Sequence, residues 1–196
     1  MRIRKYLWGV VCLFVAGGAV ADGDGSAACD APVYDTFRPV RQTEPSALVA
    51  IEVNMAPVAK LRVPDGFRRW GVLPHGSLGL GAHPEGVRAL LHYDTPETVA
   101  VHQEGISPAD FNRSVFRGSS EMGCRYLKAL HLEGSDYRLY RRFDNGAELF
   151  AYGMASEHHF TLIRRDKADL VLEGVFYGVT RQSFELILST IEMEET

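Results

Sequence analysis

The sequence predicts an α+β domain in which an antiparallel sheet of about six or seven strands packs with helices. Three observations support this fold class. Short runs of apolar and alternating residues recur between residues 48 and 177, as expected for strands. The last four runs are joined by turns too short for a parallel crossover, which predicts an antiparallel meander. Segments after Ser107 and after Thr180 carry helix-start signals.

Five apolar-rich runs in the first half of the domain predict strands, at residues 48–53, 58–63, 77–82, 87–93 and 98–103. The Pro64-Asp65-Gly66 turn closes the second run. In the fourth run, Arg88, Leu90 and His92 alternate with smaller or apolar residues, which is typical of a strand with one buried face. These runs would form the first half of the sheet.

Ser107 begins the best-defined helix of the sequence. Its hydroxyl can cap the helix, Pro108 takes the first helical position, and Asp110 can return the capping bond. Gly118 ends this helix, because glycine readily adopts the left-handed conformation of a C-terminal cap. Residues 121–130 fit either a further helical turn or a strand, and the pattern does not separate the two.

Four strands joined by short turns follow, at residues 137–143, 147–154, 158–164 and 169–177. The Asp144-Asn145-Gly146 turn between the first two is a strong hairpin signal. Alternation predicts that one face of this meander is apolar, formed by Leu139, Phe143, Phe160, Leu162, Leu170 and Leu172.

A final helix is predicted after Thr180, whose hydroxyl can cap it. An apolar stripe with i, i+3, i+4 and i+7 spacing is formed by Phe184, Ile187, Leu188 and Ile191. This stripe has to pack against the sheet to be shielded from water.

Two segments of the chain have a familiar form. Residues 61–67 read Leu-Arg-Val-Pro-Asp-Gly-Phe, and residues 170–191 read as a strand, a short turn and a helix that ends in the Ile-Leu-Ser-Thr-Ile run at 187–191. The first resembles the opening strand-Pro-x-Gly-aromatic segment of the Mog1/PsbP-like domains, and the second resembles the way many of them end. Small exported bacterial proteins of the DcrB type are similar in plan. The resemblance implies an antiparallel sheet sandwiched by helices, and a role as a binding, assembly or accessory factor. Because the group has no catalytic motif, the resemblance implies no catalytic residue in this chain.

The N-terminus has the parts of a signal peptide in order: the positive residues Arg2, Arg4 and Lys5, an uncharged apolar run over 6–18, and the small-x-small site Ala19-Val20-Ala21. The apolar run is shorter than the roughly 20 residues that cross a bilayer. We therefore expect export to the periplasm, cleavage after Ala21 and no membrane span in the mature chain. An uncleaved anchor helix is the alternative.

A lipid anchor is a second alternative for export. Ser26-Ala27-Ala28-Cys29 places small residues before a cysteine, as lipid attachment requires. Asp22 and Asp24 separate this site from the apolar run, which argues against a lipoprotein. Residues 22–46 contain many small residues and prolines and are expected to be a flexible tail, followed by a single domain over 47–196.

Charge argues against two classes of partner. Without the leader, 18 basic residues face 25 acidic ones, a formal charge of −7, and no basic run is present. Nucleic acids and anionic lipids need a basic surface, so neither is an expected partner.

Cys29 and Cys124 remain after the leader and its Cys12 are removed. Two cysteines in an oxidising compartment most simply form one disulfide, which would tie the N-terminal segment to the middle of the domain. The alternative is a pair of free thiols.

The sequence contains no motif for catalysis or for a cofactor. His75-Gly76-Ser77 comes nearest to a nucleophilic serine, but a strand is predicted next, where such a serine needs a helix. Adjacent His158 and His159 would face opposite sides of a strand. His92 and His102 would meet only if their strands paired as a hairpin. We therefore expect no cofactor and no metal site.

Six residues of the 144–146 hairpin form the candidate binding interface. Alternation places Arg138, Tyr140 and Arg142 on one face of the first strand, and Glu148, Phe150 and Tyr152 on one face of the second. Aromatic residues rimmed by charges are favoured at protein interfaces. The alternative is an ordinary outer sheet face, or one that a helix covers.

These observations predict an exported, non-catalytic binding or accessory protein whose partner is another periplasmic protein. An immunity protein that neutralises a toxin is one form of this hypothesis. Two alternatives remain open: a periplasmic hydrolase whose active site is dispersed over residues such as His75, Ser77 and a carboxylate, and a binder of a small apolar ligand between the sheet and the helices.

Overall fold

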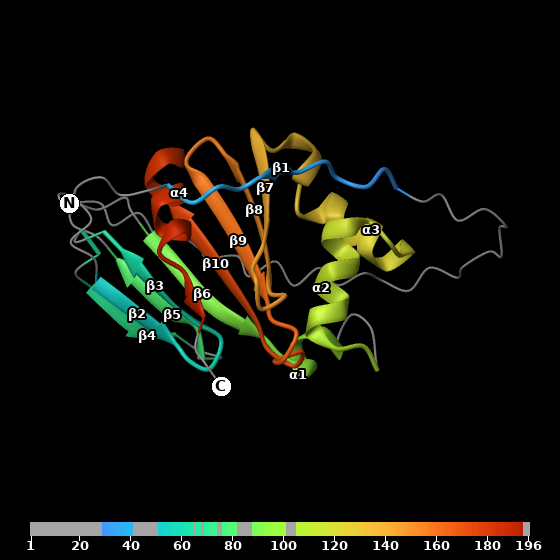
Figure 1. Cartoon of the computed structure of the whole chain (residues 1–196), viewed down its shortest axis with the longest axis horizontal. Helices are drawn as coiled ribbons and strands as arrows, with labels where there is room; N and C mark the ends of the chain where they lie inside the picture. Colours follow the sequence, from blue (N-terminus) through green and yellow to red (C-terminus); the bar gives the residue numbers. More distant parts are fainter. Residues whose placement is uncertain are drawn as a thin grey trace, which may run out of the picture.

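A computed structural model describes residues 29–40, 51–64, 66–67, 69–73, 76–81, 88–100 and 105–193. Within these ranges the chain is mixed α+β, with two sheets and four α-helices (Figure 1). The helices are α1 Pro96–Ala100, α2 Pro108–Arg117, α3 Glu121–Ala129 and α4 Arg181–Ser189.

The larger sheet has the order β1-β7-β8-β9-β10-β6-β5-β4. Its strands are β1 Asp35–Thr36, β4 Arg69–Val72, β5 Leu78–Gly81, β6 Arg88–Asp94, β7 Tyr137–Arg142, β8 Glu148–Met154, β9 Glu157–Ile163 and β10 Val171–Tyr177. The smaller sheet, β11-β3-β2, contains β2 Ile51–Met55, β3 Ala59–Val63 and β11 Glu192–Met193. All pairings are antiparallel except that of β1 with β7. The predicted meander, β7 to β10, is confirmed.

The structure differs from the expected single sheet of about six or seven strands, because β2 and β3 form a separate sheet with β11. Strands β1, β4 and β11 were not expected from the sequence, and β1 and β4 lack a local signal. Strand β1 has two exposed residues, and β4 has three exposed residues and one half-buried residue. Neither therefore shows the alternation by which a half-buried strand is recognised.

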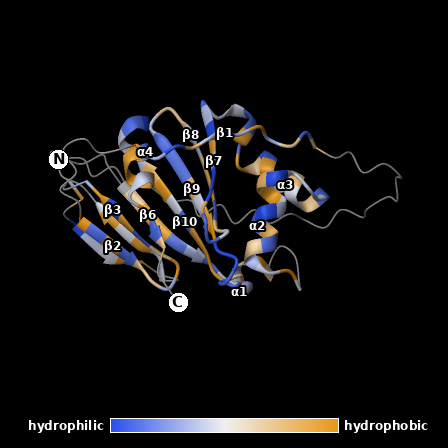
Figure 2. Ribbon diagram, in the orientation of Figure 1, coloured by the Kyte–Doolittle hydropathy of each residue, from blue (hydrophilic) through white to orange (hydrophobic). Residues whose placement is uncertain are grey.

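Two apolar layers cover the two faces of the larger sheet. On one face, residues such as Leu139, Phe160 and Leu172 pack with α4 and the smaller sheet. On the other, Phe150 and Val171 pack with α2 and α3. Figure 2 shows the resulting mixture of apolar and polar residues along the strands and helices. The expected apolar face of the meander is confirmed and forms the main core.

Both predicted capped helices are confirmed. Ser107 Oγ accepts a hydrogen bond from the backbone N–H of Asp110, at 3.1 Å, and Gly118 ends α2 in the left-handed conformation, with φ 57°. Thr180 caps α4 through the N–H of Ser183, at 3.1 Å. Residues 121–130 fitted either a helix or a strand from the sequence. In the structure they contain helix α3, which Ser120 caps.

The strand predicted over residues 98–103 is wrong in its first part. Residues 98–100 belong to α1, and residues 101–103 lie outside the described ranges. Pro96 starts this helix, and the backbone N–H of Thr95 donates to Thr98 Oγ1 at 2.8 Å. A proline and a local side-chain cap therefore override the short apolar run.

The described part of the expected N-terminal tail, residues 29–40, lies against the domain. Cys29 forms the predicted disulfide with Cys124 of α3, β1 pairs with β7, and Phe37 is buried in the main core. The backbone N–H of Val40 donates to Ser189 Oγ at 2.9 Å. This segment therefore runs from α3 along the sheet edge to α4, which differs from the expected flexible tail.

Residues 1–21, the expected signal peptide, lie outside the described residues. Among the described residues, no helix is long and apolar enough to span a bilayer.

Candidate functional site

The six residues of the expected interface share one face of the β7–β8 hairpin. Their register pairs Arg138 with Tyr152, Tyr140 with Phe150, and Arg142 with Glu148. The alternation inferred from the sequence therefore holds for both strands.

Three of these six residues, Glu148, Phe150 and Tyr152, are buried, so a helix covers much of this face, as in the alternative to an open aromatic surface. Phe150 and Tyr152 are 2% and 3% exposed. The Phe116 ring of α2 stacks on Phe150, with 4.9 Å between ring centroids. Helix α2 covers the hairpin because its own apolar residues need the same shielding from water. Of the six residues only Arg142 is exposed.

Glu148 is the buried centre of a polar network at the turn end of the hairpin. Its carboxylate accepts hydrogen bonds from Arg113 Nε at 2.8 Å, from Tyr140 Oη at 2.9 Å, and from Arg117. Arg113 also donates to Asp110, at 3.1 Å. Burial alone would raise the pKa of Glu148, but the hydrogen bonds and the positive charge around it lower that pKa below its ordinary value.

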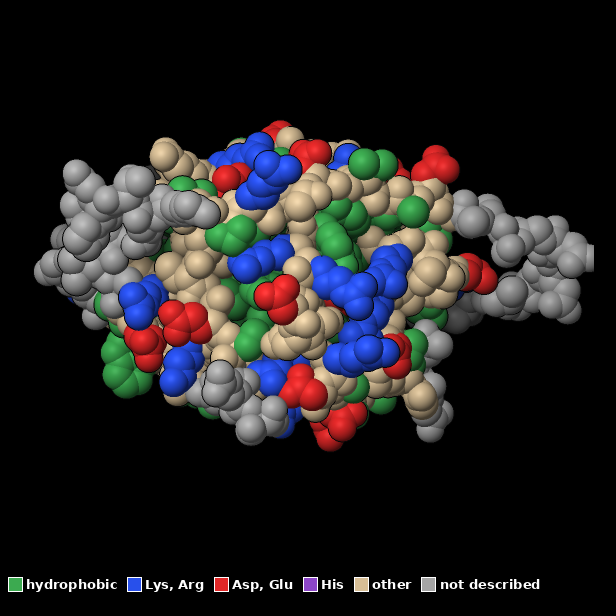
Figure 3. All heavy atoms as spheres, in the orientation of Figure 1, with side chains coloured by type: hydrophobic (Ala, Val, Ile, Leu, Met, Phe, Trp, Pro, Cys, Tyr) green, Lys and Arg blue, Asp and Glu red, His purple; other side chains and the backbone are tan. Residues whose placement is uncertain are grey.

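A surface hollow of about 280 Å³ opens beside this network, and we call it the arginine pocket. It is lined by Arg113, Arg117, Arg142, Gly146, Glu148 and Arg165. Arg142 and Arg165 form no ion pair with any residue that the structure describes, and both are exposed. Figure 3 shows basic side chains gathered over α2 on this face of the molecule. The pocket thus contains four guanidinium groups and one carboxylate, that of Glu148. Arg113 and Arg117 already bind this carboxylate.

Sequence reasoning found Arg142 and Glu148 but missed the three other arginines. Arg113 and Arg117 are four residues apart, and a helix places residues with that spacing on one side. That spacing could have marked them as a pair. The position of Arg165, in the turn after β9, depends on how that turn approaches α2, and no local pattern contains this information.

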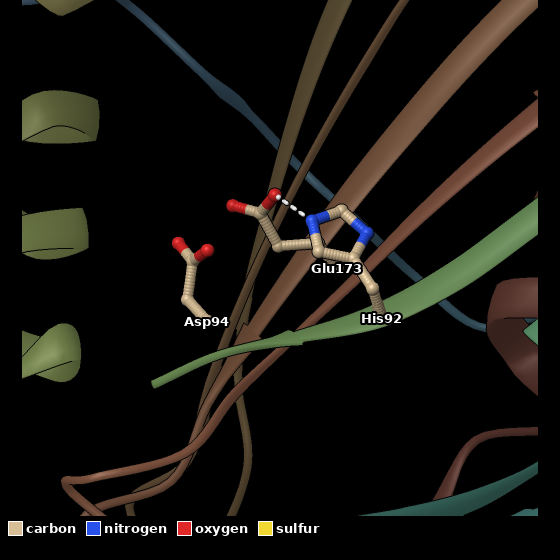
Figure 4. A group of neighbouring side chains, drawn as sticks. All are labelled: His92, Asp94 and Glu173. Carbon is tan, nitrogen blue, oxygen red and sulfur yellow. Dashed lines mark ion pairs between the residues drawn. The ribbon is translucent and has the colours of Figure 1, made fainter. Parts of the chain in front are cut away.

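A second polar cluster lies on the same face of the larger sheet, where β6 and β10 pair. His92 is the cross-strand partner of Glu173, and Asp94 lies two residues further along β6. His92 Nε2 lies 3.1 Å from Glu173 Oε2, and Figure 4 shows both carboxylates on the same side of the imidazole ring. One ligand atom from each of the three residues lies within 4.8 Å of the other two.

Asp94 is held by a neighbouring helix. The Nδ2 group of Asn112, a buried residue of α2, donates to Asp94 Oδ2 at 3.0 Å. Burial, followed by the negative charge of Glu173, raises the pKa of Asp94 to about 6. The sequence pattern His92-x-Asp94 on a strand would have placed both side chains on one face, but it does not reveal Glu173.

The described residues test only part of the other histidine arrangements considered from the sequence. His102 and His75 lie outside the described residues. His158 contacts Tyr137 Oη at 2.7 Å and the carbonyl of Val179 at 3.0 Å, so both of its ring nitrogens have structural partners.

An apolar hollow of about 340 Å³ lies at the β4 edge of the larger sheet, and Trp70, Leu73, Leu80, Leu90 and Tyr177 are among its lining residues. It lies over strands β4, β5 and β6, whereas the expected small-ligand site was between the sheet and the helices.

No protein-family model, curated protein or solved structure matches this chain. What the two polar clusters can do follows from their own residues and geometry.

Proposed function

We propose that this chain is an exported, non-catalytic binding protein that receives an anionic group of a protein partner in the arginine pocket. The observation that carries this proposal is the unbalanced charge of the pocket. Arg142 and Arg165 are exposed and have no described acidic partner, while Glu148 is already engaged by Arg113 and Arg117.

Guanidinium groups favour carboxylate ligands for a geometric reason. Each offers several N–H donors in a planar fork that matches the two oxygens of a carboxylate. Arg142 and Arg165 present such forks at one hollow, and Glu148 orients the neighbouring Arg113 and Arg117. An aspartate or glutamate side chain of a partner, or its C-terminal carboxylate, fits this arrangement.

The lining residues favour binding over catalysis. They include no serine, cysteine or histidine that could act as a nucleophile or a general base. The carboxyl group present, Glu148, has a lowered pKa and several donors on its oxygens, so it is a poor proton donor near neutral pH.

The charge of the whole chain makes the proposed contact a local one. Without the leader the chain carries a formal charge of −7, so an acidic partner is not drawn to it by long-range attraction. Affinity would arise from contacts inside the pocket, which makes recognition depend on the partner's shape. A periplasmic immunity protein that neutralises a toxin is the specific form of the proposal that fits such selective binding.

Export and family resemblance belong to the same proposal. The Cys29–Cys124 disulfide supports residence in an oxidising compartment, for which the periplasm after cleavage at Ala21 is our specific suggestion. Helices on both faces of a mainly antiparallel sheet support the suggested Mog1/PsbP-like plan.

Co-purification from the periplasm of the native organism tests the proposal. The full chain carries a C-terminal affinity tag, and a stoichiometric partner is identified by mass spectrometry. Because hydrogen bonds to charged groups contribute about 1.5–3 kcal/mol each, an Arg142→Ala and Arg165→Ala double variant should bind that partner at least about tenfold more weakly. Binding should also weaken with added salt.

Arg125→Ala is the matched control, because Arg125 is a similarly exposed arginine on α3 that does not line the pocket. It should retain the partner. If the double variant binds as tightly as the unaltered chain, the pocket is not the binding site. If no partner is recovered under conditions that preserve weak complexes, the function as a protein-binding module is refuted.

A further inference from the structure

The His92–Asp94–Glu173 cluster has a composition that differs from that of an ordinary surface ion pair. It combines one imidazole nitrogen with two carboxylates, and these are groups that bind first-row metal ions. Among the residues whose side chains the structure describes, no lysine or arginine is ion-paired with Asp94 or Glu173. The neighbouring positive group is the histidine, and only when it is protonated.

The backbone beneath the cluster is rigid. Strand β6 contributes His92 and Asp94, and the adjacent central strand β10 contributes Glu173. Strand β10 is itself paired on both sides, with β6 and with β9. Sheet hydrogen bonds thus fix the backbone positions from which the three side chains project, which favours a preformed site over one assembled by a loop.

The spacing of the ligand atoms suits a small divalent ion. Metal–ligand bonds of about 2.0–2.2 Å place neighbouring ligand atoms about 3.0–3.5 Å apart and opposite ones up to about 4.4 Å apart. Here His92 Nε2 and Glu173 Oε2 are 3.1 Å apart, and the three ligand atoms all lie within 4.8 Å of one another. The His92–Glu173 pair already has the spacing of neighbouring ligands, and rotation of the Asp94 side chain, by about an ångström or so at its oxygen, would bring the third ligand atom into coordination distance.

Apart from the contact between His92 Nε2 and Glu173 Oε2, which a bound ion would replace, the described groups around the cluster leave these ligand atoms available. Asn112 holds one oxygen of Asp94, and the other oxygen has only a long contact of 3.5 Å with Thr98 Oγ1. His92 Nδ1 has no hydrogen-bond partner among the described residues and points away from both carboxylates, so Nε2 is the ligand nitrogen (Figure 4). His92 and Glu173 are 29% and 27% exposed, so an ion can reach them from solvent.

We propose that His92, Asp94 and Glu173 bind one divalent first-row transition ion, such as Zn²⁺ or Mn²⁺. The imidazole ligand argues against Ca²⁺, which takes oxygen ligands. Three protein ligands leave further coordination positions for water or for an outside group. The site is separate from the arginine pocket, and the two share no lining residue.

Titration calorimetry with Zn²⁺, and separately with Mn²⁺, tests this site directly. The full chain carries a tag without histidine and is stripped with chelator and dialysed beforehand. One ion should bind per chain, and the bound ion should raise Tm because it binds the folded state. Asp94→Asn and Glu173→Gln keep the size of each side chain and should each weaken binding at least about tenfold.

His159→Gln is the matched control. His159 forms a similar pair with Glu157, at 2.7 Å, but it is not one of the three clustered ligands. It should leave affinity for the ion unchanged, and circular dichroism of each variant checks that the fold is intact. Failure of both ions to bind the stripped chain would overturn the proposal. So would binding that is equally tight in a folded Asp94→Asn, Glu173→Gln double variant, since the ion would then sit elsewhere.

Discussion

Replacing Glu148 by glutamine removes the negative centre of the arginine network without changing the size of the side chain. Glu148 is 5% exposed and accepts hydrogen bonds from Arg113, Arg117 and Tyr140. The glutamine amide offers one acceptor oxygen, and its NH₂ group would face guanidinium groups that cannot accept a hydrogen bond. We expect a folded but less stable protein.

The magnitude follows from the number and exposure of the bonds. Each hydrogen bond to a charged group contributes about 1.5–3 kcal/mol, compared with about 0.5–1.5 kcal/mol for a neutral one, so the change costs roughly 1 kcal/mol or more per bond. Arg117 is 54% exposed and can exchange its lost bond for water, whereas Arg113 is 22% exposed. Discounting Arg117, we expect the free energy of unfolding to fall by about 2–3 kcal/mol at pH 7.

The difference should depend on pH in a defined direction. The pKa of Glu148 is lower in the folded than in the unfolded chain, so its ionised form stabilises the fold. That contribution is fully present above its ordinary pKa of 4.5 and is lost as pH falls through the lower folded value. The stability of the unaltered chain and that of the Glu148→Gln variant should therefore converge in acid.

Urea unfolding followed by far-ultraviolet circular dichroism measures both effects. Urea is preferable to guanidinium chloride, which is a salt and screens the charges under study. Glu121→Gln is the control, because Glu121 pairs with Arg125 at 2.5 Å but both side chains are more than half exposed. That control should lose less than about 1 kcal/mol. Equal stability of the Glu148→Gln variant and the unaltered chain at pH 7 would refute the reasoning, as would a difference that persists unchanged at pH 3.

Three further perturbations test how the domain is held together. Replacing both Cys29 and Cys124 by alanine should lower the free energy of unfolding by up to about 4.7 kcal/mol, because their sequence separation of 95 closes a long loop; a loss below about 1 kcal/mol in urea would contradict this. Gly174→Ala should lower the free energy of unfolding by about 1–3 kcal/mol, since the new Cβ would lie 2.1 Å from the Phe160 ring. An unchanged Tm of this variant would contradict the prediction. Ser107→Ala should cost about 0.5–2 kcal/mol through loss of the α2 cap, whereas Ser107→Asp, which can still cap, should cost little.

Local signals predicted the features that depend on neighbours in sequence. The caps at Ser107 and Thr180 and the 144–146 hairpin turn are set by interactions within a few residues, and each lies where it was expected. The disulfide was predicted by counting cysteines rather than by geometry. The strand expected over 98–103 failed because a short apolar run is ambiguous, and a proline with a local cap decided for helix.

The candidate interface shows where periodicity stops being sufficient. Alternation correctly placed Tyr140, Phe150 and Tyr152 on one face of the hairpin. It could not indicate whether that face was open or covered, because the covering residue Phe116 lies on a helix 34 residues before Phe150. Burial of an apolar face is a property of the assembled layers and not of the strand that carries it.

The sequence by itself determined the α+β class, the capped helices, the antiparallel meander and the two cysteines available for pairing. The tertiary structure alone decided the charge balance of the arginine pocket and the meeting of His92 with Glu173. Both depend on contacts between distant segments. Helix α2 lies over β7 and β8, and β10 pairs with β6 so that Glu173 lies opposite His92, 81 residues earlier in the chain. Such contacts follow from how the elements pack and pair, because their energies come from surfaces buried between segments that carry no mutual signal in sequence.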